Sequence, residues 1–412
     1  MTKLAFYWRQ LLHKMWFLPA AFSAIAMLTI GIALYVARWA PEELPFTISR
    51  DAIQSILEIL ATSLLTVSVF ALSTLVGALS SASAATSPRA VPLIIGDRAA
   101  QTSISVFIGA FLFSILAILG LSAGIYSSAG RMLLFSVTLA VVAVVIAALI
   151  RWIAQISDIG RVGHTVDRVE AATAEALHTL DKHPLFNCRP QEGEPQGTPV
   201  RAEKLGYVQH FDAARLQELA EEHDLRIAIT ARPGAYVSSI RPLMLVLGTE
   251  QGELDEELAA TLAGTFVVGD QRSFDSDPRY GLVVLAEIAD RALSPGVNDP
   301  GTAIDVIGTL TRLLANWQPG DRQHDVDHDR LTIPALVPQD LFEDAFRPLA
   351  RDGAGCIEVM LRLLHSLEVI ADANPHLRQA ALDTASDAVG RARKALTAEG
   401  DLRALEEAAR FV

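Results

Sequence analysis

The sequence is poor in residues and motifs that would signal covalent cross-links or familiar enzyme chemistry. Two cysteines, Cys188 and Cys356, in 412 residues exclude a disulfide framework and a four-cysteine zinc site, so both thiols are expected to be reduced. The chain has no Walker phosphate loop, dinucleotide glycine fingerprint, nucleophile elbow, kinase motif set or zincin helix. These absences exclude the best-known nucleotide-dependent and hydrolytic enzymes. We therefore expect no catalytic residue, no cofactor and no bound metal.

Charge is missing from four long stretches in the first 153 residues. The stretches are Trp16–Ala37, Ile59–Leu79, Ile104–Tyr126 and Met132–Ile150. A membrane-spanning helix needs roughly 20 apolar residues, and four such runs in one segment argue against helices buried in a soluble core. We predict a transmembrane domain over residues 1–153, with spans at about 16–37, 54–79, 104–126 and 132–153. The first run is too long for a signal-peptide core and is expected to stay in the mature protein.

The two parts of the chain carry opposite net charges. Residues 1–153 hold nine Lys and Arg against five Asp and Glu, net +4, which leaves 25 against 42, net −17, for residues 154–412. Lys3, Arg9 and Lys14 precede the first apolar run, and Arg89 and Arg98 separate the second from the third. This Lys and Arg distribution predicts that both termini are cytoplasmic. An acidic cytoplasmic part also argues against nucleic acid as a partner, whereas the lipid bilayer is an expected one.

The second part alternates between strand-like and helical patterns. We predict a connecting helix and linker over residues 154–199, with a Pro-, Gly- and Glu-rich stretch at 184–199, and a cytoplasmic domain over 200–412. Residues 200–247 favour a small α+β unit in which Asp212 caps a helix, and residues 253–412 are mainly helical. The predicted fold class is an integral membrane, mainly α protein: a four-helix transmembrane module followed by an α+β, mostly helical cytoplasmic domain.

One acidic segment has side chains that can bind metals. His324–Asp329 reads HDVDHD, but its spacing matches neither a calcium loop nor a structural zinc pattern. We interpret it as a solvated loop.

The second apolar run carries polar and small residues on one side. At 100° per residue, a narrow arc of this helix holds a set that we call the polar stripe: Glu58, Thr62, Thr66 and Ser73. In one interpretation, small and hydroxyl side chains let helices approach and hydrogen-bond across their contact. In the other, the stripe lines a water-filled path, and Glu58 favours cations. Because four spans of a single chain hardly enclose a pore, the second interpretation requires a homo-oligomer.

A second distinctive segment runs from Arg291 to Asp305. Its candidate residues are Arg291, Ser294, Asn298, Asp299 and Thr302. In the structural interpretation, one helix stops at Pro295 and Asp299 caps the next, with Pro300 at its first position. Glu287 and Arg291 would then form an i,i+4 pair on the first helix. The alternative is an anion site at the new helix N-terminus, where Asp299 would repel an anion.

Several blocks of the chain resemble one family. SPRAVPLIIGDRAAQTSISVFIGAF (Ser87–Phe111) is similar to a stretch of the bacterial membrane proteins of domain of unknown function 2254. GYVQHFD (Gly206–Asp212), RPGAYV (Arg232–Val237) and RALSPGVNDPGTA (residues 291–303) resemble that family's cytoplasmic blocks in the same order. Ser276–Asp277 departs from the glutamine–aspartate pair that is more frequent there. The resemblance implies a bacterial inner-membrane protein, and it implies no activity or catalytic residue.

Three functions remain open on the sequence. The first is a homo-oligomer with a pore or ion pathway lined by the second span and regulated by the acidic cytoplasmic domain. The second is a membrane-anchored sensor or scaffold whose cytoplasmic domain binds a ligand or protein without transport. The third is an enzyme, for which one polar set is worth testing: Arg272, Asp275, Asp277, Arg291 and Asp299. The expected partners besides lipid are a small ion or a cytosolic ligand.

Overall fold

The computed structural model describes residues 17–37, 49–95, 98–156, 161–248, 254–318 and 326–412. These residues form two compact units. The first unit comprises the described residues within 8–84 and 91–164, and the second comprises residues 85–90 together with those within 165–412. The short segment 85–90, which directly follows a long helix of the first unit, therefore belongs to the second unit.

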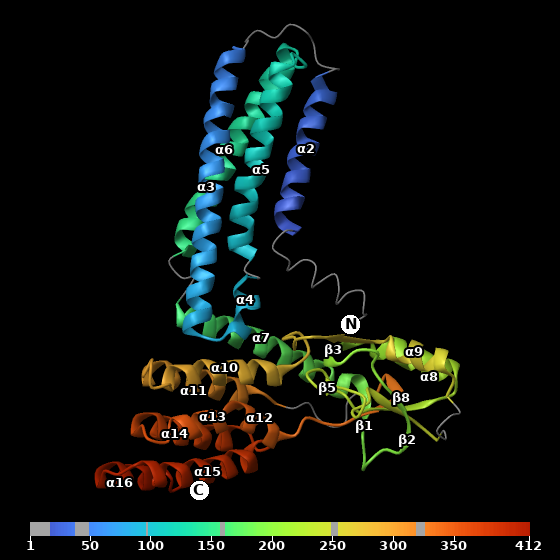
Figure 1. Ribbon diagram of the computed structural model, residues 1–412, viewed down its shortest axis with the longest axis vertical. Helices are drawn as coiled ribbons and strands as arrows, with labels where there is room; N and C mark the ends of the chain where they lie inside the picture. The colour runs from blue at the N-terminus through green and yellow to red at the C-terminus, as the bar shows by residue number, and fades with distance from the viewer. Residues whose placement is uncertain (1–16, 38–48, 96–97, 157–160, 249–253, 319–325) are drawn as a thin grey trace. The chain divides into compact units, whose positions relative to one another are not determined.

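The first unit consists of helices, and its long helices run side by side (Figure 1). The long helices are α2 (Phe17–Ala37), α3 (Arg50–Ala85), α5 (Arg98–Ser122) and α6 (Ser128–Ile156), and the short α4 (Val91–Ile95) precedes α5. Among the described residues, three stretches are long and apolar enough to cross a membrane, namely Arg50–Ala85, Gln101–Ser122 and Ser128–Ala154. Helix α2, with 21 residues, coincides with the first expected span, but several of its side chains lie outside the described part.

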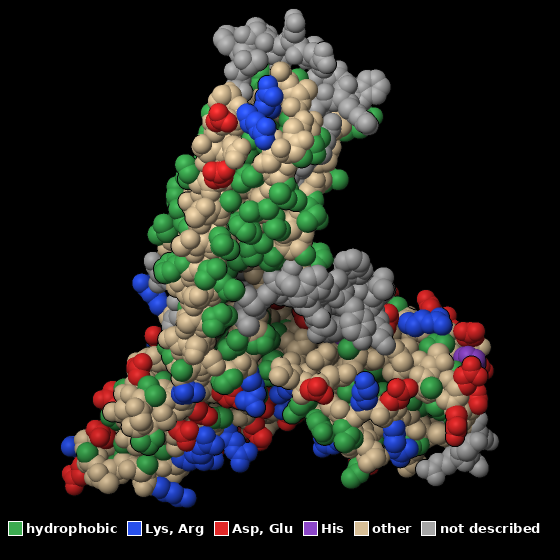
Figure 2. All heavy atoms as spheres, turned by 45° about the horizontal axis from the view of Figure 1, so that its top comes forward, with side chains coloured by type: hydrophobic (Ala, Val, Ile, Leu, Met, Phe, Trp, Pro, Cys, Tyr) green, Lys and Arg blue, Asp and Glu red, His purple; other side chains and the backbone are tan. Residues whose placement is uncertain are grey.

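Helix α3 has one buried side and one exposed side. The buried residues recur at helical spacing and are mostly Leu, Ile and Ala: Ile53, Leu57, Ala61, Leu64, Ala71, Leu75 and Ala82. Most of them share one hydrophobic cluster with Phe107 and Ala110 of α5 or another with Phe113 and Ala117 of the same helix, and both clusters also include residues of α6. Hydrophobic side chains also gather on the outside of the helical unit, whereas charged side chains gather on the other unit (Figure 2). A lipid-facing surface needs this distribution.

The second unit contains two sheets that share one core. A five-stranded sheet has the order β1 (Cys188–Pro190), β8 (His328–Ile333), β4 (Arg226–Ile229), β6 (Met244–Leu247) and β2 (Gly197–Val200). An antiparallel three-stranded sheet has the order β5 (Tyr236–Val237), β3 (Gly206–Phe211) and β7 (Phe266–Gly269). Helix α8 (Ala213–Glu222) buries Leu216 and Leu219 in this core, and its N-cap Asp212 accepts a hydrogen bond from the Arg215 backbone N–H, as expected.

Helices complete the second unit. They are α7 (Val162–Lys182), whose first residues belong to the other unit, α9 (Glu256–Ala263), α10 (Pro278–Leu293), α11 (Pro300–Asn316), α12 (Pro338–Ala345), α13 (Arg347–Asp352), α14 (Ile357–Ala373), α15 (Arg378–Ala395) and α16 (Glu399–Ala408). Helix α10 packs on α11, α11 on α14, and α14 on α15, so these helices form successive layers (Figure 1).

The structure differs from the sequence-based expectation at two segments of the sheet. The stretch 184–199, expected to be a linker, contributes the short strands β1 and β2. The acidic segment at 324–329 was expected to be a loop, but its last two residues begin strand β8. Both errors have the same cause: these strands are short and lie next to proline or acidic residues, so hydrophobic periodicity carries little signal.

Candidate functional site

The polar stripe lies on the exposed side of α3. Glu58, Thr62, Thr66 and Ser73 are all exposed in the single chain. The stripe is therefore turned away from the seam that packs on α5. Its neighbours on the exposed side include the large apolar residues Ile59, Val69 and Val76, which are 56–66% exposed.

Part of the polarity of the stripe is satisfied within the helix. The Thr62 hydroxyl donates to the Glu58 carbonyl oxygen over 2.9 Å, and the Thr66 hydroxyl donates to the Thr62 carbonyl oxygen over 3.1 Å. The Gln54 side-chain amide donates to the Glu58 carboxylate over 2.8 Å. Such local bonds let hydroxyl groups sit in an apolar surrounding at low cost. The Glu58 carboxylate has more acceptor capacity than one amide can fill, so it gains most from a polar or aqueous neighbour.

The segment after α10 forms the expected elbow. The Asp299 carboxylate caps α11 by accepting hydrogen bonds from the Thr302 backbone N–H over 3.1 Å and from its hydroxyl over 2.6 Å. These two bonds lower the pKa of Asp299. Asn298 adopts φ of 51°, a left-handed conformation that Asn tolerates better than most residues. The Ser294 hydroxyl donates to the Arg291 carbonyl oxygen over 2.6 Å. The polar groups of the elbow are thus used to build the turn, and an ionised cap would repel a bound anion.

The expected pair between Glu287 and Arg291 is not formed. The Glu287 carboxylate binds the segment that follows α3 instead: it accepts a hydrogen bond from the Ser87 hydroxyl over 2.8 Å and forms an ion pair with the Arg89 guanidinium. Thr86, Ser87 and Ala90 are buried at this contact, at 0–3% exposure. Among the described residues, Arg291 makes no ion pair. The contact joins the first residues after α3 to α10, within the second unit.

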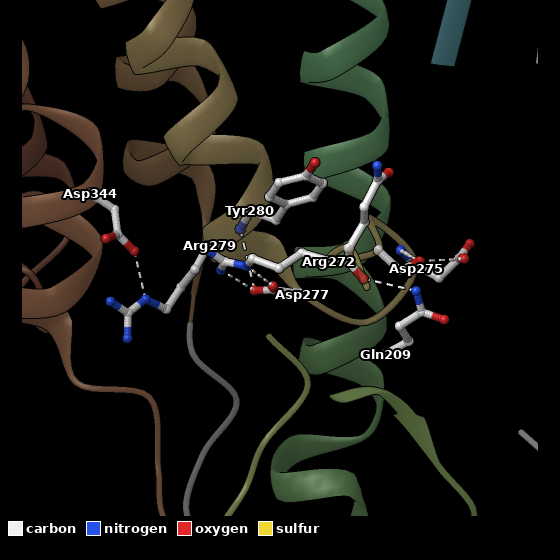
Figure 3. A network of polar contacts seen from close by, with 9 residues as sticks. Gln209, Arg272, Asp275, Asp277, Arg279, Tyr280 and Asp344 are labelled. Atoms are coloured by element: carbon white, nitrogen blue, oxygen red, sulfur yellow. Dashed lines mark hydrogen bonds and ion pairs between the residues drawn. The ribbon is translucent and has the colours of Figure 1, made fainter. Parts of the chain in front are cut away.

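A buried ion pair lies at the start of α10 (Figure 3). The Arg272 guanidinium donates to both oxygens of Asp277, over 2.7 Å and 3.0 Å. Asp277 is 3% exposed and also caps α10 by accepting from the Tyr280 backbone N–H over 3.2 Å. Burial raises the pKa of Asp277, although the neighbouring Arg272 opposes this shift. Arg272 also lies over the Tyr280 ring, 5.2 Å from its centroid.

One of the blocks quoted from the sequence, RPGAYV, lies against this pair. Gly234 of the RPGAYV block adopts φ of 90°, and a Cβ at this position would overlap the Asp277 carboxylate. Arg232 of the same block donates to the Pro334 carbonyl oxygen and lies over the Phe186 ring at 5.6 Å. Burial lowers the pKa of Arg232 to about 10, so it keeps its charge at neutral pH.

The polar set named for the enzyme hypothesis is spread over more than one place in the second unit. Arg272 and Asp277 lie at the start of α10, while Arg291 lies 14 residues after Asp277, which is about 21 Å along a helix. Asp299 lies beyond the elbow, so these residues do not form one constellation. Asp275 accepts a hydrogen bond from the Ser273 hydroxyl over 2.8 Å instead of joining the pair. Burial raises the pKa of the neighbouring Cys188 thiol to about 12, which removes it as a nucleophile at neutral pH.

The acidic segment has no metal-binding geometry in its described part. Its residues His324 and Asp325 lie outside the described residues. Asp327 accepts from the Asn187 side chain over 2.6 Å, and Asp329 accepts from the Gln217 side chain over 2.8 Å. No group of three or more His, Cys, Asp or Glu suited to a metal occurs among the described residues.

Long apolar helices joined to a mixed α and β unit define a membrane protein. The chain belongs to the family described as predicted membrane protein, domain of unknown function 2254, whose model matches residues 13–369. It is similar to uncharacterised proteins of Mycobacterium tuberculosis and Mycobacterium bovis, each 28% identical over 199 residues. The match covers 47% of this chain and 38% of each relative, so the chain aligns with well under half the length of these proteins. No solved structure matches the chain.

Proposed function

We propose that the protein is a four-span bacterial inner-membrane protein with cytoplasmic termini, in which α3 helices from several copies line an ion pathway. The cytoplasmic unit, residues 154–412, regulates this pathway. The observation that carries the proposal is the exposure of the polar stripe. Glu58, Thr62, Thr66 and Ser73 are all exposed in the single chain, on the side of α3 that its own neighbours leave uncovered.

Glu58 is the ionisable side chain of the stripe and has the largest free-energy cost in the bilayer. An ionisable side chain costs about 2.5–3.5 kcal/mol at the centre of a bilayer on insertion scales, and less toward the interface. Glu58 is the ninth residue of α3 and lies about 10 Å along the helix from Asp51. A second copy, or water held between copies, removes much of this cost. The same contact would cover the exposed apolar residues beside the stripe.

The proposed regulation uses the end of α3. Ser87 and Arg89 follow the helix directly and hold the Glu287 carboxylate of α10. Only a few residues separate the end of α3 from Ser87 and Arg89. A shift of α10 would therefore be transmitted to α3, because a continuous helix is stiff. This connection also supports the second candidate function, a membrane-anchored sensor or scaffold, in which ligand binding to the cytoplasmic unit reaches the membrane without transport.

The test has two stages. The oligomeric state of the purified protein in nanodiscs decides whether a pathway between copies exists, and a monomer contradicts the proposal. Cation flux into proteoliposomes is then compared among the wild type, Glu58→Gln and Thr66→Leu. We expect both changes to reduce flux, because each removes a polar group from the pathway.

Ser63→Leu is the matched control. Ser63 is exposed on the same helix but lies about 90° from the centre of the stripe. Flux that responds equally to Ser63→Leu and Thr66→Leu, or to neither Thr66→Leu nor Glu58→Gln, refutes the pathway. An oligomer with no cation flux favours the sensor or scaffold.

A separate pair of variants tests the regulation. Arg89→Glu and Glu287→Arg each place like charges together at the contact after α3, and the double variant restores opposite charges. We expect each single change to alter flux and the double change to return it toward the wild-type value. If the flux of the double variant is no closer to the wild-type value than the flux of either single variant, the proposed regulation through this contact is contradicted.

A further inference from the structure

A groove between α11 and α14 gathers guanidinium and hydroxyl groups. Its volume is about 240 Å³. Thr311 and Arg312 of α11 and Arg362, His365 and Ser366 of α14 form its polar lining, and Gly308 lies between them. The groove lies within the second unit and is separate from both the elbow and the Arg272–Asp277 pair.

The Arg312 guanidinium is held in one orientation. Its Nε and Nη2 atoms donate to the two oxygens of Glu170 on α7, over 2.9 Å and 2.7 Å, and Nη2 also donates to the Thr309 hydroxyl over 3.0 Å. This bidentate pair leaves Nη1 on the side of Gly308, 3.8 Å from where a Cβ of that residue would lie. Glu170 therefore positions Arg312 and leaves one of its nitrogens directed at the groove.

A second guanidinium reaches the same place from the opposite helix. The Nη2 atom of Arg362 lies 3.3 Å from the position of a Gly308 Cβ. Among the described residues, Arg362 forms neither an ion pair nor a hydrogen bond. The two guanidinium groups repel each other at this distance, and a bound anion between them would offset the repulsion. Glycine at 308 keeps that space open.

The groove also contains a buried hydroxyl that is not used elsewhere. Ser366 is 3% exposed and lines the groove. Its side chain makes no hydrogen bond to the described part of the chain, whereas the Thr311 hydroxyl donates to the Ile307 carbonyl oxygen over 2.7 Å in the usual helical manner. The Ser366 hydroxyl lines the groove and can donate to an acceptor placed there.

We propose that this groove binds the phosphate group of a small ligand, through Arg312 Nη1, Arg362 and the Ser366 hydroxyl. Guanidinium groups bind phosphate by short charge-assisted hydrogen bonds, and their planar forks match its geometry. The net charge of −17 on residues 154–412 repels anions at long range, so binding requires this local arrangement. His365 lies at the rim, where its Nδ1 atom is 3.7 Å from Glu368.

The test is calorimetric titration of the full-length protein in detergent with sodium phosphate at constant ionic strength. We expect saturable binding to the wild type and a loss of about tenfold or more in affinity for Arg362→Gln, since an ionic hydrogen-bond donor is removed. Gly308→Leu fills the groove and should weaken binding in the same way. Arg393→Gln is the matched control, because Arg393 is an exposed residue of α15 with the same charge.

Two outcomes overturn the proposal. One is the absence of saturable phosphate binding to the wild type at about 10 mM. The other is an equal loss in Arg362→Gln and Arg393→Gln, which would show a charge effect without a site. A water-soluble, short-chain phosphatidic acid distinguishes the two sources of a phosphate group. Arg362-dependent binding that is tighter for the lipid identifies a headgroup, and tighter binding of inorganic phosphate identifies a soluble ligand. Neither result depends on ion flux, so the ion pathway can fail independently.

Discussion

Replacing Asp290 by Asn should stabilise the protein at neutral pH. Asp290 lies on α10 and faces Arg351 and Asp352 of α13, with its Oδ2 atom 3.4 Å from the Arg351 guanidinium. Its other oxygen, Oδ1, is buried and has no hydrogen-bond partner among the described residues. Burial, followed by the repulsion of Asp352, raises the pKa of Asp290 to about 6. The folded protein thus holds this carboxylate in an unfavourable ionised state at pH 7.

The size of the effect follows from the pKa. The folded state binds the Asp290 proton more tightly than the unfolded state, whose pKa is 3.8. The ionised carboxylate therefore costs stability above about pH 6, and this cost disappears as the pH falls below about 4. Two pKa units correspond to about 3 kcal/mol as an upper limit. Partial exposure of the side chain, at 24%, and the lost contact with Arg351 reduce the expected gain to about 1–2 kcal/mol.

The assay is thermal unfolding of the purified protein from pH 4 to pH 8, followed by tryptophan fluorescence. We expect the Asn variant to melt several degrees above the wild type at pH 7, and the difference to vanish near pH 4. Asp352→Asn is the matched control. The hydrogen bonds from Arg351 to Asp352, over 2.6 Å and 2.9 Å, lower the pKa of Asp352. Asp352→Asn loses these ionic bonds while it relieves the repulsion on Asp290, so it should stabilise the protein less at pH 7 than Asp290→Asn does. A lower melting temperature for Asp290→Asn at pH 7, or a difference independent of pH, refutes the reasoning.

Three further predictions concern α10 and the elbow. Asp277→Ala leaves a mostly buried guanidinium without its partner and removes the cap of α10, so unfolding should become easier by about 3–5 kcal/mol in chemical denaturation. In Gly281→Ala the new methyl group would overlap the Thr173 side chain of α7, which should cost about 1–3 kcal/mol. Thr173→Ala should recover part of that loss of stability. If the effects of Gly281→Ala and Thr173→Ala on the unfolding free energy are simply additive, the close contact between these two positions is contradicted. Thr302→Val should raise the pKa of Asp299, measured by NMR titration, because its principal hydrogen bond is lost.

The sequence predicted the parts of the fold that depend on local physics. The elbow is one example, because a proline at the first helical position and a capping carboxylate require only neighbouring residues. The separation of Glu58 and Thr62 from Leu57 and Leu64 on two sides of α3 is another, since it follows from the 3.6-residue helical period. What the stripe faces in the membrane lies outside the single chain, so the pore and the homo-oligomer stay proposals.

The parts that the sequence did not predict depend on contacts between distant residues. Glu287 was assigned to Arg291 because the two are four residues apart, but it pairs with Arg89, 198 residues away in the chain. Arg232 and Phe186 likewise meet by tertiary folding alone. A short-range rule for charged pairs yields only a few tenths of a kcal/mol. Such a weak preference is easily overcome when the fold brings another guanidinium, that of Arg89, to the Glu287 carboxylate.

Helix α10 contacts several segments that are far apart in the sequence. Its N-terminal cap, Asp277, lies so close to Gly234 that a Cβ at position 234 would overlap the carboxylate. One turn later Gly281 lets α7 approach, and two turns further Glu287 holds the segment after α3. Because a helix is stiff along its axis, we expect a displacement of the buried pair at one end to reach the contact between Glu287 and the segment after α3. If the proposed ion pathway exists, we expect Asp277→Asn, which preserves shape but weakens the pair with Arg272, to alter flux in the same direction as Glu287→Gln. Opposite effects of the two variants on flux would show that α10 does not act as one body.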